Sequence, residues 1–320
     1  MPRIGVTIIG VTTKHLRRSA LVVLAVLSIG TAPAIAAAPR LPAAPACDLF
    51  PASNVWNHRV DHLPVRADSS DLVSSIGAGD HLHPDFSSIQ GGGYGIPYNV
   101  VGRAAPRHLV GFTYADESDA GPYPIKDGAL IEGGSDRHLL TVDRRECVLY
   151  ELFAARLTED GWRAGSGAIW DLDSNALRPR GWTSSDAAGL PVLPGLVRHS
   201  EVAAGAIEHA LRFTAPETRR AFVYPARHFA SDSDDPDLPP MGLRVRLKAS
   251  VDISAFGPQS RILLTTLRRY GMILADNGSP WFVTGTPDPG WDDDDLHELH
   301  GLSGSDFEAV DTSSLRNGAP

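Results

Sequence analysis

The sequence lacks the short motifs that identify many nucleophilic and metal-dependent enzymes. It has no Gly-x-Ser-x-Gly elbow, no Walker loop, no His-Glu-x-x-His and no Cys-x-x-Cys. The glycine-rich run 90–95 lacks the strand and helix that a dinucleotide loop requires, so we expect a turn there. These absences leave acids, histidines and aromatic residues as the candidate functional groups.

Positive charge and long apolar runs are also scarce. The main apolar run lies within the first 36 residues, where basic residues precede it and Ala34-Ile35-Ala36 forms a small-x-small cleavage site. We therefore expect an export signal over residues 1–36 and no membrane-spanning segment. Its removal takes away four basic residues and no acid, which changes the net charge from −9 to −13. So acidic a chain disfavours nucleic acid and other polyanions as partners.

Cysteine is nearly absent, because the chain has only Cys47 and Cys147. In the oxidising compartment that an export signal implies, extracellular or periplasmic, the two thiols are expected to form a disulfide. The alternative is a buried thiol at Cys147 and a free one at Cys47. After a linker over residues 37–46, we expect a single β-rich domain over residues 47–320.

The segment 128–175 carries the clearest strand pattern. Its predicted strands, joined by turns, cover residues 138–143, 147–154 and 167–171. A period of two places Glu151 on the same strand face as Cys147, Leu149 and Phe153. An acid on an otherwise apolar face must find a partner or shift its pKa upward.

The rest of the chain predicts more strands than helices. Further strands are expected at residues 96–101, 109–114, 206–214, 220–224 and 242–248, and a hairpin joins 272–275 to 281–284. Helices are expected at 69–76, at 258–270 and from the acidic run 292–295. The predicted fold is a mostly β single domain, a β-sandwich or jelly-roll-like arrangement with one or two helices near the C-terminus.

Three further segments have features that are common in functional sites but that match no specific motif. The connection 175–195 is long, and long ordered loops are often functional. The acidic segment 115–124 is either a solvated turn or a calcium loop, and we prefer the turn. The pair His81 and His83 could suggest a metal, but the spacing matches no specific zinc signature, so no metal is expected.

Three acids are the candidate catalytic carboxyl groups: Glu151, Asp171 and Asp173. An extended segment would aim Asp171 and Asp173 at one face, which Glu151 would reach from a neighbouring strand about 4.8 Å away. Apolar neighbours would raise the pKa of Glu151 and suit it to the role of general acid, while Asp171 or Asp173 stays ionised as nucleophile or base. The alternative is that Asp173 begins a turn and Glu151 has a structural role. In that case the next candidates are Glu132 and Asp136.

Three histidines that lie in or beside predicted strands are candidates for proton transfer: His138, His209 and His228. With ordinary pKa values near 6.5, they would change charge within the range where a secreted enzyme works.

Acids, histidines and aromatic residues on a β scaffold fit carbohydrate chemistry, in which paired carboxylates do acid–base work and rings stack on sugars. The candidate sugar-binding residues are Trp170, Trp182 and Tyr224. We therefore expect a secreted glycoside hydrolase that acts on an extracellular polysaccharide or oligosaccharide and needs no cofactor. One alternative is a polysaccharide lyase with His209 or His228 as base and Tyr224 as acid. The other is a non-catalytic carbohydrate- or cell-wall-binding module.

Three blocks of the sequence resemble segments of exported bacterial proteins. They are WDLDSN at 170–175, RPRGW at 178–182 and YGMILADNGS at 270–279. The resemblance covers most of the chain after the export signal, and it implies export and a single domain. It assigns no catalytic residue.

Overall fold

The computed structural model describes residues 38–89 and 94–318, together with Gly10. The predicted export signal lies outside the described residues except for Gly10, and so does most of the predicted glycine turn. The description below concerns the unit Ala36–Pro320. In the described part of the chain, no helix is long and apolar enough to cross a membrane.

A mixed six-stranded sheet is the largest sheet of this unit. Its order is β17 (Phe307–Ala309), β14 (Arg244–Leu247), β15 (Met272–Asn277), β13 (Leu211–Ala215), β16 (Phe282–Thr284) and β3 (His83–Asp85). The hairpin predicted between 272–275 and 281–284 is wrong, because β13 lies between β15 and β16. The buried strand β13 thereby pairs its backbone on both edges, with β15 and with β16.

A four-stranded sheet contains the predicted central hairpin. Its order is β12 (Ser166–Asp171), β9 (Val148–Phe153), β8 (Leu139–Asp143) and β4 (Tyr98–Val101). Glu151 pairs with Leu140 and Ala168, which belong to one apolar cluster, while Tyr150 and Leu152 pack in another cluster. The prediction of an acid on an apolar strand face is therefore confirmed.

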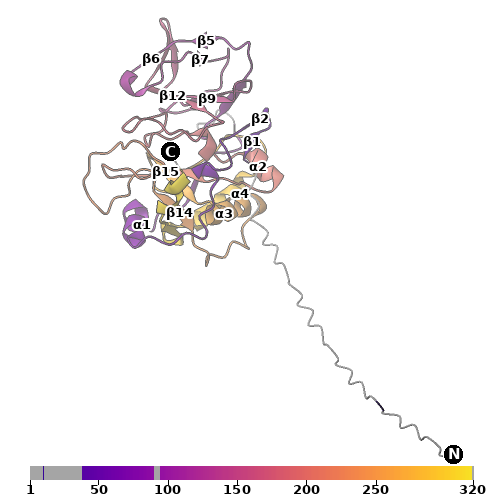
Figure 1. The fold of residues 1–320 in the computed structure, drawn as a ribbon, viewed down its shortest axis with the longest axis vertical. Coiled ribbons are helices and arrows are strands. Elements are labelled where there is room, and N and C mark those ends of the chain that lie inside the picture. The colour runs from indigo at the N-terminus through magenta and orange to yellow at the C-terminus, as the bar shows by residue number, and fades with distance from the viewer. Residues whose placement is uncertain (1–9, 11–37, 90–93, 319–320) are drawn as a thin grey trace, which may run out of the picture. The chain divides into compact units, whose positions relative to one another are not determined.

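Three small sheets complete the β structure. They comprise β10 (Arg156–Thr158), β11 (Gly161–Ala164) and β6 (Val110–Phe112); β5 (Arg107–His108) and β7 (Tyr123–Pro124); and β1 (Arg40–Leu41) and β2 (Ala44–Asp48). The segment expected to be a linker, 37–46, thus contains β1 and the start of β2. The expected strand 220–224 makes only an isolated bridge between Phe222 and Met241. Figure 1 shows β5, β6 and β7 at the opposite end of this unit from β14 and α3.

The helices are short, and the mostly β prediction is confirmed. The α-helices are α1 (Ser69–Gly77), α2 (His199–Ala204), α3 (Pro258–Arg269) and α4 (Asp293–His297). The 3-10 helices are η1 (Val55–Asn57), η2 (Ala115–Glu117), η3 (Leu193–Gly195), η4 (Glu298–Gly301), η5 (Gly304–Asp306) and η6 (Ser313–Gly318). The acidic run begins a helix as expected, because Asp292 accepts the N–H of Asp295 and caps α4. No expectation from the sequence covers α2, which is only six residues long.

The largest apolar cluster joins the six-stranded sheet to its helices. It contains Leu72 of α1, Leu263 of α3 and Leu296 of α4, together with Phe213 and Leu274 of the central strands. Burial of apolar surface stabilises a fold by about 25 cal/mol per Å². This cluster therefore holds the helices against the six-stranded sheet, which carries part of the site described below.

The predicted disulfide is present between Cys47 and Cys147, which are 100 residues apart in the sequence. It joins the end of β2 to the turn between β8 and β9. The bridge limits the freedom of the unfolded chain over a long loop, which is the main way a disulfide stabilises a fold.

We expect the double variant Cys47→Ala, Cys147→Ala to lose about 2–5 kcal/mol of the free energy of unfolding, because the unfolded chain regains the entropy that the bridge removes. Urea denaturation of the variant and of the oxidised wild type would measure the loss. Equal denaturation midpoints, or two free thiols in the unfolded and unreduced wild type, would contradict the expectation.

Candidate active site

A cavity of about 510 Å³ beside the end of β15 holds four acidic residues and one histidine. We call it the acid cavity. It is bounded by η2, by the 172–192 loop that connects β12 to η3, by the segment 228–232 and by Asp276 of β15. Its lining residues are Tyr114, Glu117, Phe153, Ser166, Thr183, Ser184, Ser185, Asp186, Ala187, His228, Phe229, Ala230, Asp232 and Asp276.

Asp276 faces this cavity because β15 contains a β-bulge. The register of β15 against β13 shifts by one residue at Ala275, so that Asp276 pairs with Thr214. Residues that pair across neighbouring strands lie on the same face of the sheet. The bulge therefore turns Asp276 to the face that carries Thr214 and Arg212, whereas a regular strand would turn it to the other face.

The surroundings of Asp276 favour its protonated form. Burial raises the pKa of this carboxyl to about 7, and the negative charge of Asp186 acts in the same direction. Arg212 opposes both effects, as does the backbone N–H of Asn277, which donates to Asp276 Oδ1 over 2.7 Å. A carboxyl with a pKa near 7 can act as a general acid near neutral pH.

Asp186 is held by a bidentate contact with Arg212. The guanidinium donates to Oδ1 over 2.5 Å and to Oδ2 over 3.0 Å, and its third nitrogen donates to Thr284 Oγ1 over 2.5 Å. The side chain of Asp186 is fully buried and that of Arg212 nearly so. Both oxygens of Asp186 are thus occupied, and the residue supplies a fixed negative charge near Asp276 rather than a group that meets a substrate.

A second buried ion pair fixes the loop next to Asp186. His138 Nδ1 lies 2.5 Å from Glu132 Oε2, and Nε2 lies 2.9 Å from the carbonyl oxygen of Ser185. Burial would lower the pKa of His138, but the hydrogen bond to Glu132 and its charge outweigh burial and raise the pKa to about 9. The ring is therefore an imidazolium that donates at both nitrogens, and it orients the backbone at Ser185.

Glu151 is fully buried and accepts hydrogen bonds from four residues. The donors are Trp170 Nε1 at 3.1 Å, Ser185 Oγ at 3.2 Å, and the backbone amides of Val192 at 3.0 Å and Leu193 at 2.9 Å. Burial raises the pKa of Glu151 to about 7, although the two amides oppose the change. Glu151 does not line the acid cavity; it holds the loop that carries Ser185.

Glu117 and His228 are neighbours in the lining of the acid cavity. Glu117 Oε2 accepts the backbone N–H of Thr183 over 2.9 Å and lies 3.7 Å from His228 Nε2. His228 Nδ1 lies 2.8 Å from the carbonyl oxygen of Ala187, so that nitrogen carries the proton and donates it. The other nitrogen, Nε2, is then directed at Glu117 Oε2.

Aromatic side chains border the carboxyl groups. Tyr114 has 52% of its surface exposed, and the half-buried ring of Phe229 lies parallel to that of His228, with 5.8 Å between their centroids. Exposed or half-buried rings beside hydrogen-bonding groups are a common feature of sugar-binding sites, because the apolar face of a sugar stacks on them.

The three acids predicted from the sequence are not brought into one cavity. Asp171 and Asp173 lie in an exposed turn, where Asp171 Oδ1 accepts the N–H of Asp173 over 3.0 Å, while Leu172 between them is buried. Glu151 lies in the interior, as described above. His209 is also buried away from the acid cavity, where Arg198 Nη2 donates to its Nε2 over 2.7 Å.

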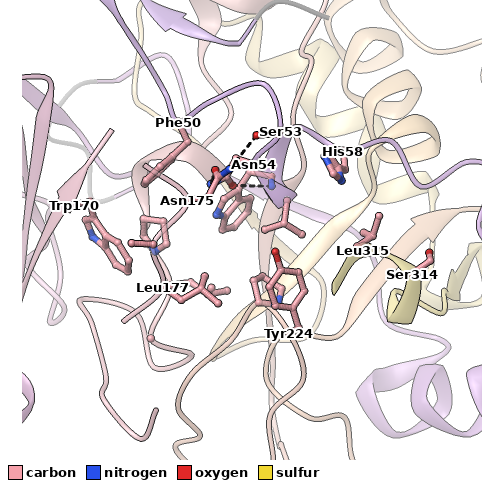
Figure 2. Close-up of a pocket in the computed structure, with 17 residues that line it drawn as sticks. Phe50, Ser53, Asn54, His58, Trp170, Asn175, Leu177, Tyr224, Ser314 and Leu315 are labelled. Atoms are coloured by element: carbon pink, nitrogen blue, oxygen red, sulfur yellow. Dashed lines mark hydrogen bonds between the residues drawn. The ribbon is translucent and has the colours of Figure 1, made fainter. Parts of the chain in front are cut away.

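The three predicted sugar-binding residues fall in two places. Trp170 and Tyr224 line a second cavity of about 190 Å³, which we call the tyrosine cavity (Figure 2). Trp182 lines neither cavity, and the guanidinium of Arg178 lies over it at 5.4 Å from the ring centroid. Tyr224 and His228, which the lyase alternative combined, therefore line different cavities.

Of the residues in and around this cavity, the sequence pattern predicts a functional role for His228 and for the loop that carries Ser185, but not for Asp186, Arg212 or Asp276. The hairpin expected between 272–275 and 281–284 places Asp276 in its turn. Its position directly after the buried run of β15 was a usable signal, because a strand end next to a loop often carries functional groups. Asp186 lies in the long loop that was predicted to be functional, although no motif distinguishes it there.

Comparisons of the chain with family models, with curated proteins and with solved structures found no match. Among the described residues, no group of three or more His, Cys, Asp or Glu side chains is arranged to hold a metal ion.

The pKa values predict how stability depends on pH. The folded state keeps a proton on Glu151 up to about pH 7 and on His138 up to about pH 9, compared with 4.5 and 6.5 for the ordinary groups. Between those values the folded state binds more protons than the unfolded state, so stability falls as pH rises. Glu132, whose pKa is lowered, loses its contribution only in more acidic solution.

We expect these two groups to lower the free energy of unfolding by about 5–6 kcal/mol between pH 5 and pH 9, because their shifts amount to about 4 pKa units over this range and one unit corresponds to about 1.4 kcal/mol. Urea denaturation at pH 5, 7 and 9 would measure it. In Glu151→Gln, the part of the decrease between pH 5 and pH 7 should become smaller. A constant or rising stability over this range in the wild type would contradict the assignment.

Proposed function

We propose that the protein is an exported polysaccharide-active enzyme, a glycoside hydrolase whose reaction takes place in the acid cavity. The observation that carries the proposal is that this cavity holds two carboxyl groups in different surroundings. Asp276 is half-buried beside the charge of Asp186, and Glu117 is partly exposed beside His228. Most glycoside hydrolases use two carboxyl groups with distinct roles.

Asp276 is assigned the role of general acid. With its pKa near 7 it holds a proton in neutral and mildly acidic solution. It gives this proton to the glycosidic oxygen as the bond between that oxygen and the anomeric carbon breaks. Asp186 supports the role indirectly, because its fixed negative charge disfavours a second charge on Asp276.

Glu117 is assigned the role of general base. Its carboxylate takes a proton from a water molecule, whose oxygen forms the new bond to the anomeric carbon. His228 Nε2, 3.7 Å from Glu117 Oε2, is placed to pass that proton on. The hydroxyl group of the water stays on the anomeric carbon, and the proton of Asp276 stays on the leaving oxygen. The proton that Glu117 takes returns to Asp276 through solvent, so that one water molecule is consumed and two sugar chains form.

The charge and the rings of the cavity support a neutral glycan as substrate. Four acidic residues line the cavity and none of its lining residues is Lys or Arg, which disfavours uronates. Tyr114 and Phe229 provide surfaces against which sugar rings can stack. The disulfide is compatible with the oxidising compartment in which such a substrate occurs.

The test is to incubate the purified protein with a panel of neutral and anionic polysaccharides and to assay both reducing ends and the ultraviolet absorbance of unsaturated uronates. We expect new reducing ends from at least one neutral polysaccharide and no unsaturated products. Unsaturated products would instead identify a lyase. Binding without either product would identify a non-catalytic binding module, and both of these results would overturn the proposal.

A further inference from the structure

The 172–192 loop contributes lining residues to both the tyrosine cavity and the acid cavity. Residues 183–187 of this loop line the acid cavity, and residues 189–191 line the tyrosine cavity. Glu151 connects the two, because it accepts hydrogen bonds from Trp170 of the tyrosine cavity and from Ser185 of the acid cavity. The two cavities share no lining residue, so a ligand in one does not occupy the other.

The tyrosine cavity contains no formal charge. None of its lining residues is Asp, Glu, Lys or Arg, and burial lowers the pKa of His58, which keeps this ring neutral near pH 7. Placing an ion in such a site would cost free energy without a compensating partner. The ligand that fits is therefore uncharged.

Polar groups in the cavity are positioned in advance. Asn54 Nδ2 donates to Asn175 Oδ1 over 2.9 Å, and Asn175 Nδ2 donates to Ser53 Oγ over 2.9 Å (Figure 2). Asn54 Oδ1 accepts the backbone N–H of Trp56, which fixes the first amide in turn. Each amide nitrogen keeps a second hydrogen that it can donate to a ligand.

Tyr224 supplies a further polar group that is not used within the protein. Its ring is half-buried, burial raises the pKa of its phenol, and none of the described residues forms a hydrogen bond with its hydroxyl. Figure 2 shows Tyr224 together with Asn175 and Leu177 at the same cavity. A polar hydroxyl beside apolar side chains such as Leu177 and Leu315 suits a ligand with both apolar and hydroxyl surfaces.

We infer that the tyrosine cavity binds one neutral sugar unit of a glycan, at a site separate from the acid cavity. Its volume of about 190 Å³ exceeds the 150 Å³ or so of an apolar cavity that admits benzene, so one six-membered ring fits. Tyr224 and the two asparagines bind hydroxyl groups, and the leucines contact the C–H face. The choice of a sugar over another neutral amphipathic molecule rests on the proposed function.

The test uses neutral monosaccharides, which the enzyme cannot hydrolyse, and detects binding by amide chemical shifts of the wild-type protein. Glucose, galactose, mannose, xylose and N-acetylglucosamine are the probes, with glucuronate and glucosamine as charged counterparts. We expect at least one neutral sugar to shift the amides around Tyr224 and Asn175, and the charged sugars to bind at least about tenfold more weakly there.

Two variants locate the site. Ala176→Trp adds an indole at an exposed position of the cavity wall and should abolish these shifts, whereas Leu157→Trp, at an exposed position of β10 outside both cavities, should not. Tyr224→Phe should weaken binding by roughly twofold to tenfold, the value of one hydrogen bond.

The outcomes separate this inference from the proposed function. Shifts confined to the acid cavity, no shifts with any neutral sugar, or shifts that Ala176→Trp leaves unchanged would overturn the inference, even if the protein hydrolyses a polysaccharide. Sugar binding in the tyrosine cavity without hydrolysis of any polysaccharide would support the inference and contradict the proposed function.

Discussion

Replacing Asp276 with Asn is expected to lower turnover on the hydrolysed glycan by at least about a hundredfold, because the amide cannot supply a proton to the leaving oxygen. The fold should persist, since Asn has nearly the same shape and removes a carboxyl group whose charged form burial disfavours. Steady-state rates of wild type and variant, with thermal unfolding of both, would measure the two effects.

The matched controls are the acids that the sequence pattern favoured. Asp171→Asn and Asp173→Asn change exposed carboxyl groups outside the acid cavity, and both should keep turnover within a few-fold of wild type. If either of these variants loses a hundredfold while Asp276→Asn remains active, the reaction does not take place in the acid cavity.

The largest loss of stability is expected for Arg212→Met. The substitution leaves the fully buried carboxylate of Asp186 without its partner, and breaking a buried ion pair in this way costs about 3–5 kcal/mol. It also removes the hydrogen bond to Thr284 Oγ1. The free energy of unfolding in urea, measured at pH 7, would show the loss.

A surface pair provides the comparison. Arg220 and Asp234 form an ion pair whose side chains are 49% and 74% exposed, so Arg220→Met should cost less than about 1 kcal/mol. Adding Asp186→Leu to Arg212→Met should recover part of the loss, because no buried charge then remains unpaired. If Arg212→Met costs no more than Arg220→Met, the buried pair does not stabilise the site as described.

Local patterns predicted much of the fold. The alternation of residues predicted the hairpin of β8 and β9 and the burial of Glu151 on an apolar face, and helical spacing predicted α3. Each of these features depends on neighbours in the sequence. The insertion of β13 between β15 and β16 depends on segments about 60 residues apart, which no local pattern specifies.

The candidate site could be predicted less well than the fold, because it too depends on contacts between residues far apart in the sequence. Asp276 faces the cavity only because of a one-residue bulge, and a bulge is visible only in the register of two paired strands. Arg212 has no feature in the sequence that distinguishes it from other strand residues. Its role in the site depends on the ion pair with Asp186, 26 residues before it. His228 was predicted, because a histidine beside acids is a local signal, but its partner Glu117 was not.

The most direct test of the central claim is a crystal structure of the Asp276→Asn variant with an oligosaccharide of the polysaccharide that the wild type hydrolyses. The account predicts a glycosidic oxygen within about 3 Å of the residue 276 side chain, the distance that proton transfer requires, and a sugar ring against Tyr114 or Phe229. An oligosaccharide that leaves the acid cavity empty, whether it binds in the tyrosine cavity or elsewhere, would contradict it.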